Sequence, residues 1–265
     1  MPTTPRLGFL YPGHAAEDEY PTLGRMLSKA VDIDVVHTAL GEQGDAHTVE
    51  SLRDMGTKER LSAGAAVLRR RRADAVVWAC TSGSFVYGWG GAREQVAALE
   101  ADVGAPTSST SLAFVHAANV LGTTRVAIAA TYPDDVAACF VELLRAAGIE
   151  VVHLSTSGIM TAGEAGDLGP EGTFDMVATA DHPGAEAVLV PDTALHSIEI
   201  IPRLESALGK PVLTANQVSV WEALWLAKLS ATADAGTLFT RAMPVTSAIP
   251  APPMQRRQGT TQGAT

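Results

Sequence analysis

Ala73-Asp-Ala-Val-Val-Trp-Ala-Cys-Thr81 is matched later in the chain by Ala185-Glu-Ala-Val-Leu-Val-Pro-Asp-Thr193. Each stretch has an acidic residue in its second position, continues through an apolar run and ends in polar residues. Continuous apolar runs of this length are typical of strands that helices bury on both faces of a parallel sheet. The repetition of the stretch predicts an α/β protein made of two units with the same topology.

Two further pairs of segments repeat in the same order. Arg6-Leu-Gly-Phe-Leu-Tyr-Pro12 resembles Arg125-Val-Ala-Ile-Ala-Ala-Thr-Tyr-Pro133, and Gly104-Ala-Pro-Thr-Ser resembles Gly209-Lys-Pro-Val-Leu. We therefore predict two pseudo-symmetric lobes, each with a mainly parallel sheet. The first lobe spans residues 1–120 and the second spans residues 121–217, while a helix within residues 218–240 packs back on the first lobe.

Apolar runs and helical periodicity alternate along the chain. Helices are expected at residues 58–72 and 133–147, where Gly148 provides the stop. The Pro-, Thr- and Gly-rich end, residues 244–265, has few residues able to bury surface and is expected to be a disordered tail. Strands are expected at residues 7–11, 32–38, 75–79, 125–130, 150–154 and 187–190.

Composition limits the classes of function. The formal net charge of -10 argues against a nucleic-acid or anionic-membrane surface. No apolar run is long enough to span a bilayer, and the N-terminus lacks the apolar region and cleavage site of a signal peptide. We expect a cytoplasmic protein that binds neither nucleic acid nor membranes.

Cys80 and Cys139 are the two cysteines of the sequence, so a disulfide framework is not expected. The seven histidines are scattered, and no Cys/His spacing matches a metal site. We therefore expect no metal. Cys139 falls within a predicted helix, where a small core residue is the expected role.

The polar ends of the two matching strands are the main candidate site. Ligands of parallel α/β sheets bind at the carboxyl ends of the strands, where helix N-termini converge. The duplication places Cys80, Thr81 and Ser82 opposite Asp192 and Thr193 if the lobes face each other. Cys80 is then a candidate reactive thiol, although a buried packing cysteine fits equally well. For Asp192, a helix N-cap is a sufficient structural explanation.

Four other residues follow predicted strands. Tyr132 could donate its hydroxyl to an oxyanion or serve only in the turn. Pro12 and His14 form the corresponding turn of the first lobe, where His14 either binds a carboxylate or is simply solvated. Asn216 follows a further strand expected at residues 211–214 and is a candidate polar wall of the same cleft.

In this order, four motifs resemble the maleate cis-trans isomerase and arylmalonate decarboxylase branch of the aspartate/glutamate racemase superfamily. The resemblance covers about residues 6–240 and implies two flavodoxin-like lobes with the active site in the cleft between them, without metal or organic cofactor. The motifs are Gly8-Phe-Leu-Tyr-Pro12, Cys80-Thr-Ser-Gly-Ser84, Thr131-Tyr-Pro-Asp-Asp-Val136 and Gly209-Lys-Pro-Val-Leu-Thr-Ala-Asn-Gln217.

Members of this branch typically use one cysteine from each lobe. By resemblance, Cys80 takes the first-lobe position, and Thr81, Ser82 and Tyr132 match hydroxyls that bind carboxylate and enediolate oxygens. The sequence departs from the pattern in two places. Asp192 stands where the second cysteine is expected, and Pro12-Gly13-His14-Ala15 stands where isomerases commonly have an asparagine.

These observations predict an isomerase that acts next to a carboxylate of a small carboxylic or dicarboxylic acid, with Cys80 as the reactive thiol and Asp192 as a second acid/base. An arylmalonate-type decarboxylase and an amino-acid or hydantoin racemase are the enzymatic alternatives. A non-catalytic protein that binds a small acid is the alternative of another class. Similar proteins are commonly homo-oligomers, but no sequence feature fixes the oligomeric state.

Overall fold

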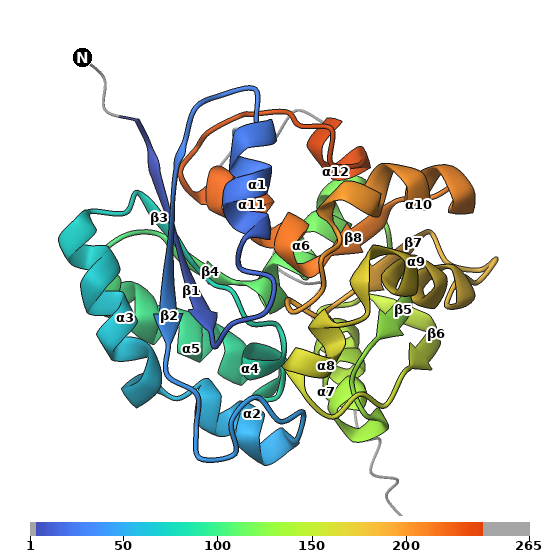
Figure 1. Cartoon of the computed structure of the whole chain (residues 1–265), viewed down its shortest axis with the longest axis horizontal. Helices are drawn as coiled ribbons and strands as arrows, with labels where there is room; N and C mark the ends of the chain where they lie inside the picture. Colours follow the sequence, from blue (N-terminus) through green and yellow to red (C-terminus); the bar gives the residue numbers. More distant parts are fainter. Residues whose placement is uncertain (1–3, 241–265) are drawn as a thin grey trace, which may run out of the picture.

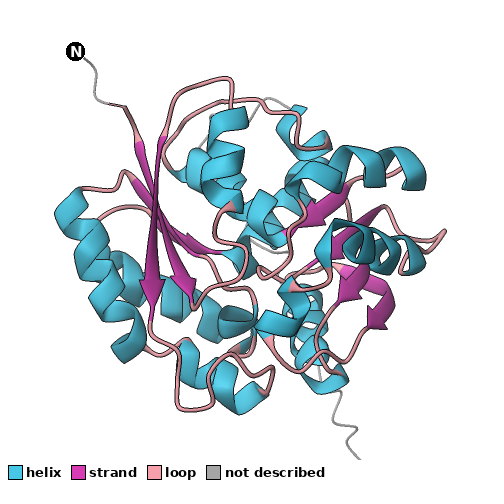
Figure 2. Cartoon of the chain, in the orientation of Figure 1, coloured by secondary structure: helices cyan, strands magenta, loops and turns pink. Residues whose placement is uncertain are grey.

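The chain forms two four-stranded sheets flanked by helices (Figures 1 and 2). The structure is a computed structural model that describes residues 4–240, so the predicted disordered tail at residues 244–265 lies outside the described range. All pairs of neighbouring strands are parallel, and the two sheets have equivalent strand orders. The predicted α/β class with two pseudo-symmetric lobes is confirmed.

The first sheet has the order β2-β1-β3-β4. Its strands are β1 (Arg6–Pro12), β2 (Asp32–Thr38), β3 (Ala75–Trp78) and β4 (Thr107–Ser109). The connecting helices are α1 (Glu19–Met26), α2 (Val49–Met55), α3 (Lys58–Arg71), α4 (Ser82–Phe85), α5 (Gly88–Val103) and α6 (Thr110–Leu121).

The second sheet has the equivalent order β6-β5-β7-β8. Its strands are β5 (Arg125–Ala130), β6 (Glu150–Thr156), β7 (Ala187–Val190) and β8 (Val212–Thr214). Around it and after it come α7 (Asp134–Ala146), α8 (Ala162–Gly166), α9 (Gly169–Thr179), the 3-10 helix η1 (Ile198–Ile200), α10 (Ile201–Leu208), α11 (Ala215–Leu226) and α12 (Thr237–Thr240).

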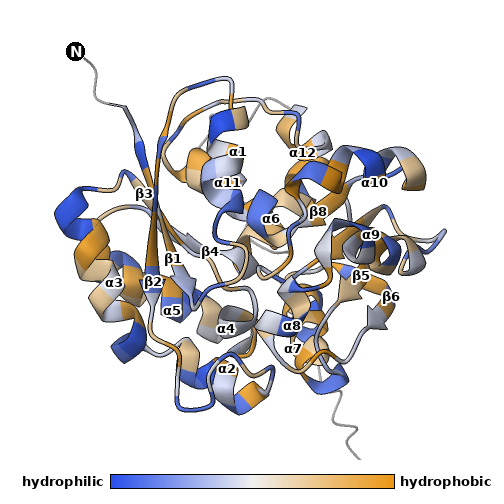
Figure 3. Cartoon of the chain, in the orientation of Figure 1, coloured by the Kyte–Doolittle hydropathy of each residue, from blue (hydrophilic) through white to orange (hydrophobic). Residues whose placement is uncertain are grey.

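The central strands are apolar because both of their faces are covered. Every residue of β3 and β7 is buried, as their sequences predict. Hydropathy colouring shows that α3 carries apolar and polar stretches, as expected for a helix with one face toward a sheet (Figure 3). None of the helices within residues 4–240 has the length and apolar character needed to cross a lipid bilayer.

Helix α11 follows the last strand of the second sheet but packs against the first lobe. It contacts α6, β3, α1, β4 and β1. The hydroxyls of Thr110 on α6 and Ser219 on α11 are hydrogen-bonded at 2.6 Å. His116 and Glu222 form a buried pair between the same helices, with Nδ1 and Oε1 2.7 Å apart. The two lobes therefore share a helical interface as well as a cleft.

Two exposed glycines have open space around them, so replacing each with alanine tests the effect of backbone conformation without a steric clash. Gly122 ends α6 with φ of 72°, whereas Gly90 lies inside α5, and a Cβ at either position would meet no atom within 4 Å. Left-handed backbone costs an L-residue about 1–2 kcal/mol, so Gly122→Ala is expected to lower the free energy of unfolding by about 1 kcal/mol. Gly90→Ala is expected to raise it by about 0.5 kcal/mol because alanine favours a helix. Urea denaturation measures both; changes of the same sign would contradict this interpretation.

Candidate active site

The ends of β3 and β7 meet at one cavity. Cys80 lies two residues beyond β3, Asp192 lies two residues beyond β7, and both line a cavity of about 80 Å³. The two strands are the third of their respective sheets in sequence, so pseudo-symmetry brings equivalent ends together. Six of the predicted site residues line this cavity: Pro12, His14, Cys80, Ser82, Asp192 and Thr193.

The thiol of Cys80 is buried against the start of α4. Its Sγ accepts a hydrogen bond from the N–H of Gly83 at 3.3 Å and lies 3.7 Å from the hydroxyl of Ser82. Burial raises the pKa of Cys80 to about 11; the Gly83 and Ser82 contacts oppose this shift, and the Asp192 charge adds to it. The thiol is therefore protonated at neutral pH in the ligand-free protein.

Asp192 has two hydrogen bonds that fix its carboxylate. The hydroxyl of Thr131 donates to Oδ2, and the N–H of Ala194 donates to Oδ1 at 2.9 Å. The predicted helix N-cap is wrong, because the next helical element begins at Ile198 and Asp192 instead closes a local turn. Each carboxylate oxygen retains a further lone pair for a ligand in the cavity.

Tyr132 and Thr81 do not line the cavity, in contrast to their predicted role as direct substrate contacts. Tyr132 is buried and donates its hydroxyl to the carbonyl of Pro191 at 3.0 Å. Burial, followed by the nearby Asp192 and Cys80 charges, raises the pKa of Tyr132 well above its ordinary value. The Thr81 hydroxyl is fully buried and has no hydrogen-bond partner among the described residues. Both side chains form the layer behind the cavity wall.

Asn216 is also placed behind the wall, so the prediction that it lines the cleft is wrong. Its Oδ1 accepts a hydrogen bond from the Tyr20 hydroxyl at 2.9 Å. Its Nδ2 lies 2.8 Å from Oε2 of Glu19 and 3.2 Å from the carbonyls of Thr193 and Leu195. The amide is saturated by the protein and holds the backbone that follows Asp192.

Glu19, which the sequence did not reveal, joins the two lobes. This residue starts α1 in the first lobe, yet its Oε1 accepts the N–H groups of Ser197 and Ile198 at 2.6 and 2.7 Å. Burial raises the pKa of Glu19, against the hydrogen bonds from Asn216, Ile198 and Ser197. The Tyr11 hydroxyl adds a hydrogen bond to the carbonyl of Thr193 at 3.0 Å. First-lobe side chains thus position the second-lobe loop that carries Asp192.

A second contact between the lobes lies at the edge of the cavity. The backbone N–H of His47 donates to the carbonyl of Met160 at 2.7 Å, and the ring Nδ1 of His47 lies 2.9 Å from the carbonyl of Ile159. Asp45 Oδ2 accepts the N–H of Gly163 at 2.8 Å. His47 and Asp45 also line the cavity, and neither is part of a motif that the sequence singles out.

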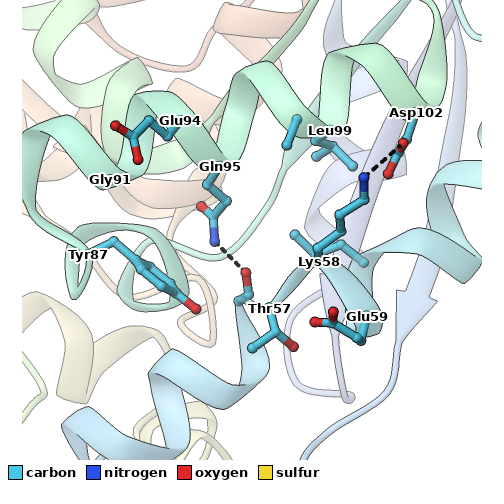
Figure 4. Close-up of a pocket in the computed structure, with 12 residues that line it drawn as sticks. Thr57, Lys58, Glu59, Tyr87, Gly91, Glu94, Gln95, Leu99 and Asp102 are labelled. Carbon is cyan, nitrogen blue, oxygen red and sulfur yellow. Dashed lines mark hydrogen bonds and ion pairs between the residues drawn. The ribbon is translucent and has the colours of Figure 1, made fainter.

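A larger groove of about 340 Å³ lies outside the cavity, between the start of α3 and α5 (Figure 4). None of the predicted site residues lines it. Gln95 points into this groove and donates to the carbonyls of Gly56 at 2.7 Å and Gly83 at 2.9 Å. Because Gly83 donates its own N–H to Cys80, Gln95 supports the backbone beside the thiol.

The described residues that could hold a metal ion are His14, Glu17 and His37, whose ligand atoms all lie within 4.8 Å of one another. His14 lines the cavity edge and its Nδ1 lies 2.8 Å from Oε1 of Glu17. Partial burial acts to raise the pKa of Glu17, but hydrogen bonds from His14 and from backbone N–H groups outweigh this effect, so the pKa is lowered. Histidines that are distant in the sequence are therefore brought together here, although no Cys/His spacing along the chain indicated a metal site.

A family described as arylmalonate decarboxylase matches residues 46–239, which is most of the chain. The chain belongs to the arylmalonate decarboxylase family. The resemblance that the motifs predicted is confirmed. The family assignment rests on the region that includes both Cys80 and Asp192, and the cavity between them is the candidate active site of this family member.

Relatives of this arylmalonate decarboxylase family member include isomerases and a decarboxylase. A maleate isomerase of Geobacillus stearothermophilus is 28% identical over 183 residues, covering 67% of this chain and 72% of that protein. An arylmalonate decarboxylase of Bordetella bronchiseptica is 26% identical over 171 residues, covering 64% of this chain and 71% of that protein. A solved structure of Nocardia farcinica maleate cis-trans isomerase, a cysteine-to-serine mutant with a covalently bound succinylcysteine intermediate, has a TM-score of 0.81 at 19% identity, covering 89% of this chain and 98% of that chain. The chain is therefore similar to enzymes and has their fold.

Removing the Glu19 carboxylate should weaken the contact between the lobes. Glu19→Ala leaves the N–H groups of Ser197 and Ile198 without their acceptor, and each such loss costs about 1–3 kcal/mol. We expect the free energy of unfolding, measured by urea denaturation, to fall by about 3 kcal/mol. Glu199→Ala is the matched control because Glu199 is exposed on the same segment, and it should change the value by less than about 0.5 kcal/mol. Equal effects of the two substitutions would show that Glu19 does not join the lobes.

The raised pKa of Cys80 predicts slow alkylation. A thiol with pKa of about 11 has about 100-fold less thiolate at neutral pH than one with the ordinary value of 9.0. In a Cys139→Ser protein, iodoacetamide should modify Cys80 at least about 100-fold more slowly at pH 7.5 than it does in the same protein unfolded in urea. The rate should rise with pH until about 11, as followed by mass spectrometry. A rate that levels off near pH 8.5 would contradict the predicted pKa.

Proposed function

We propose that this protein is an isomerase that exchanges a proton at the carbon next to the carboxylate of a small carboxylic acid. The observation that carries the proposal is the placement of the Cys80 thiol and the Asp192 carboxylate, one from each lobe, on the walls of a single cavity. Family membership supports this assignment because the relatives named above include isomerases. Cys80 and Asp192 are the proposed catalytic residues.

The cavity favours a substrate with one carboxylate. Its described lining includes Asp45 and Asp192 but neither lysine nor arginine. A second carboxylate on the substrate would therefore face negative charge without a cationic partner. Ser82, Thr193 and His14 offer hydrogen-bond donors for a single carboxylate. A volume of about 80 Å³ restricts the part of the substrate inside the cavity to a few non-hydrogen atoms.

The proposed reaction moves two protons. Asp192 removes the proton from the substrate carbon, and the electron pair of that bond passes to the carboxylate to form an enediolate. The protonated thiol of Cys80 then donates its proton to the opposite face of the carbon, which inverts the configuration. Cys80 ends as a thiolate that accepts the Gly83 N–H, and Asp192 ends protonated. Exchange with solvent returns both groups to their starting forms.

The pKa of Cys80 favours proton donation over nucleophilic addition. A thiol with pKa of about 11 is protonated at neutral pH and is therefore an acid before it is a nucleophile. Formation of a carbon–sulfur bond, as in the covalently bound succinylcysteine intermediate of the Nocardia enzyme, needs the thiolate. Substrate binding would have to lower the pKa of Cys80 before this protein could follow the cis-trans route.

A decarboxylase is the second candidate. Loss of CO2 from a malonate-type substrate leaves the same enediolate, and Cys80 then supplies the proton without any base. An apolar wall of the cavity is formed by Leu40, Leu52 and Met55. An ionised carboxylate against this wall is destabilised because it loses its hydration, whereas neutral CO2 carries no such cost, and this difference favours loss of CO2. The match to the arylmalonate decarboxylase family also supports this reaction.

A screen in heavy water tests the proposal and separates the two reactions. Substituted malonates, maleate and chiral 2-substituted carboxylic acids are incubated with the protein, and products are followed by NMR. Deuterium incorporation with racemisation indicates the proposed isomerase, and CO2 release indicates the decarboxylase. Cys80→Ala and Asp192→Asn are each expected to lower racemisation by at least about 100-fold, the usual contribution of a general acid or base.

Cys139→Ala is the matched control because Cys139 lies on α7 and does not line the cavity. It should retain the activity of the parent protein. Full turnover by a folded Cys80→Ala protein would exclude Cys80 as the catalytic acid. A carboxylic acid that raises the melting temperature but is never converted would favour the binding-protein alternative.

A further inference from the structure

His14, Glu17 and His37 converge at the edge of the cavity although they come from two separate segments. His14 and Glu17 lie in the connection between β1 and α1, and His37 lies near the end of β2. Oε1 of Glu17 is 2.8 Å from Nδ1 of His14 and 3.6 Å from Nε2 of His37. The two imidazole rings have centroids 4.0 Å apart. Two histidines and one carboxylate thus point at a common position.

The backbone explains why these side chains meet. β1 and β2 are neighbouring parallel strands, with Tyr11 paired to His37 and Pro12 paired to Thr38. Gly13, with φ of 62°, then turns the chain so that His14 returns over the end of β2. The arrangement follows from strand register and one left-handed glycine.

Two separations between the donor atoms are close to those expected around a zinc ion. Zinc binds histidine nitrogen and carboxylate oxygen at about 2.0–2.2 Å, so two ligands in tetrahedral geometry lie about 3.3 Å apart. The observed separations of 2.8 and 3.6 Å fall on either side of this value. All three donor atoms lie within 4.8 Å of one another, so one ion could contact them together.

We propose that His14, Glu17 and His37 form a binding site for a divalent transition-metal ion of the zinc type at the mouth of the cavity. Oε2 of Glu17 accepts the N–H of Ala15 at 2.8 Å, which orients the carboxylate as outer hydrogen bonds orient metal ligands. Three protein ligands leave at least one position of a tetrahedral ion open. The exposed fractions of the side chains, 73% for His14, 27% for Glu17 and 40% for His37, let an ion enter from solvent.

The location gives the ion a consequence for the cavity. His14 lines the cavity edge, and the described lining contains Asp45 and Asp192 but no lysine or arginine. A bound divalent cation places positive charge beside this acidic cavity, and its open position accepts an oxygen ligand such as a carboxylate. The site itself rests on ligand geometry alone and stands whether or not Cys80 is catalytic.

A similar histidine–carboxylate pair on the surface has only two potential ligands. His196 lies 2.9 Å from Oδ1 of Asp18, with 38% of the histidine side chain exposed. The exposure is close to that of His37, but within residues 4–240 no second histidine joins this pair as a ligand. His196 therefore provides a matched control for adventitious binding by a surface histidine and carboxylate.

Binding of Zn²⁺ and Co²⁺ to the full-length protein tests the site. We expect one equivalent of Zn²⁺ by isothermal titration calorimetry, and visible absorption bands of bound Co²⁺ that added Zn²⁺ removes. His14→Ala, His37→Ala and Glu17→Gln should each weaken Zn²⁺ binding by about tenfold or more, because loss of an orienting partner alone costs 10- to 100-fold. His196→Ala should bind as the parent protein does, and melting temperatures establish that each variant is folded.

Two results would overturn the proposal. The first is that the parent protein does not bind Zn²⁺. The second is that a His14→Ala/His37→Ala double variant binds Zn²⁺ as the parent does; if Cys80→Ala then removes the binding, the ion lies on the thiol. Neither result depends on turnover, so a wrong metal site and a wrong catalytic assignment are distinguished.

Discussion

The buried carboxylate of Glu19 is the interaction on which the relative position of the two lobes depends. A carboxylate that loses its hydration is unfavourable unless hydrogen bonds replace the water. Here Ser197, Ile198 and Asn216 supply N–H donors from the second half of the chain. Glu19 is therefore stable in only one arrangement of the lobes, the one in which the loop after β7 lies against α1.

That arrangement converts a repeated sequence into a single site. Each lobe alone would expose a strand end with one reactive group, a thiol in the first and a carboxylate in the second. Together they enclose a cavity whose walls include both Cys80 and Asp192. The symmetry is incomplete, since α4 begins two residues after Cys80 and its Gly83 donates an N–H to sulfur, whereas the segment after Asp192 is a turn that binds the carboxylate. Each end thus offers a backbone N–H to its reactive side chain, from a helix in the first lobe and from a turn in the second.

The sequence predicted the elements that depend on local patterns. The apolar runs at β3 and β7 and the duplication required both strands to end at the same kind of edge, so Cys80 and Asp192 could be named in advance. Tyr132 and Asn216 were given contacts with substrate because they follow strands, but the direction of a side chain depends on partners distant in sequence. Asn216 accepts a hydrogen bond from the Tyr20 hydroxyl, and Tyr132 donates one to the Pro191 carbonyl. Both partners belong to other elements of the structure. No periodicity encodes such pairings.

The cluster of His14, Glu17 and His37 could have been predicted from the rule that neighbouring parallel strands end at the same edge of a sheet. The predicted strands at residues 7–11 and 32–38 end next to His14 and His37, and neighbouring parallel strands end at one edge. Spacing along the chain is therefore the wrong measure for ligands carried by different strands; position relative to the strand end is the right one. By the same measure, Cys80 and Asp192 belong together although more than a hundred residues separate them, and the chemistry of the chain is organised by strand ends.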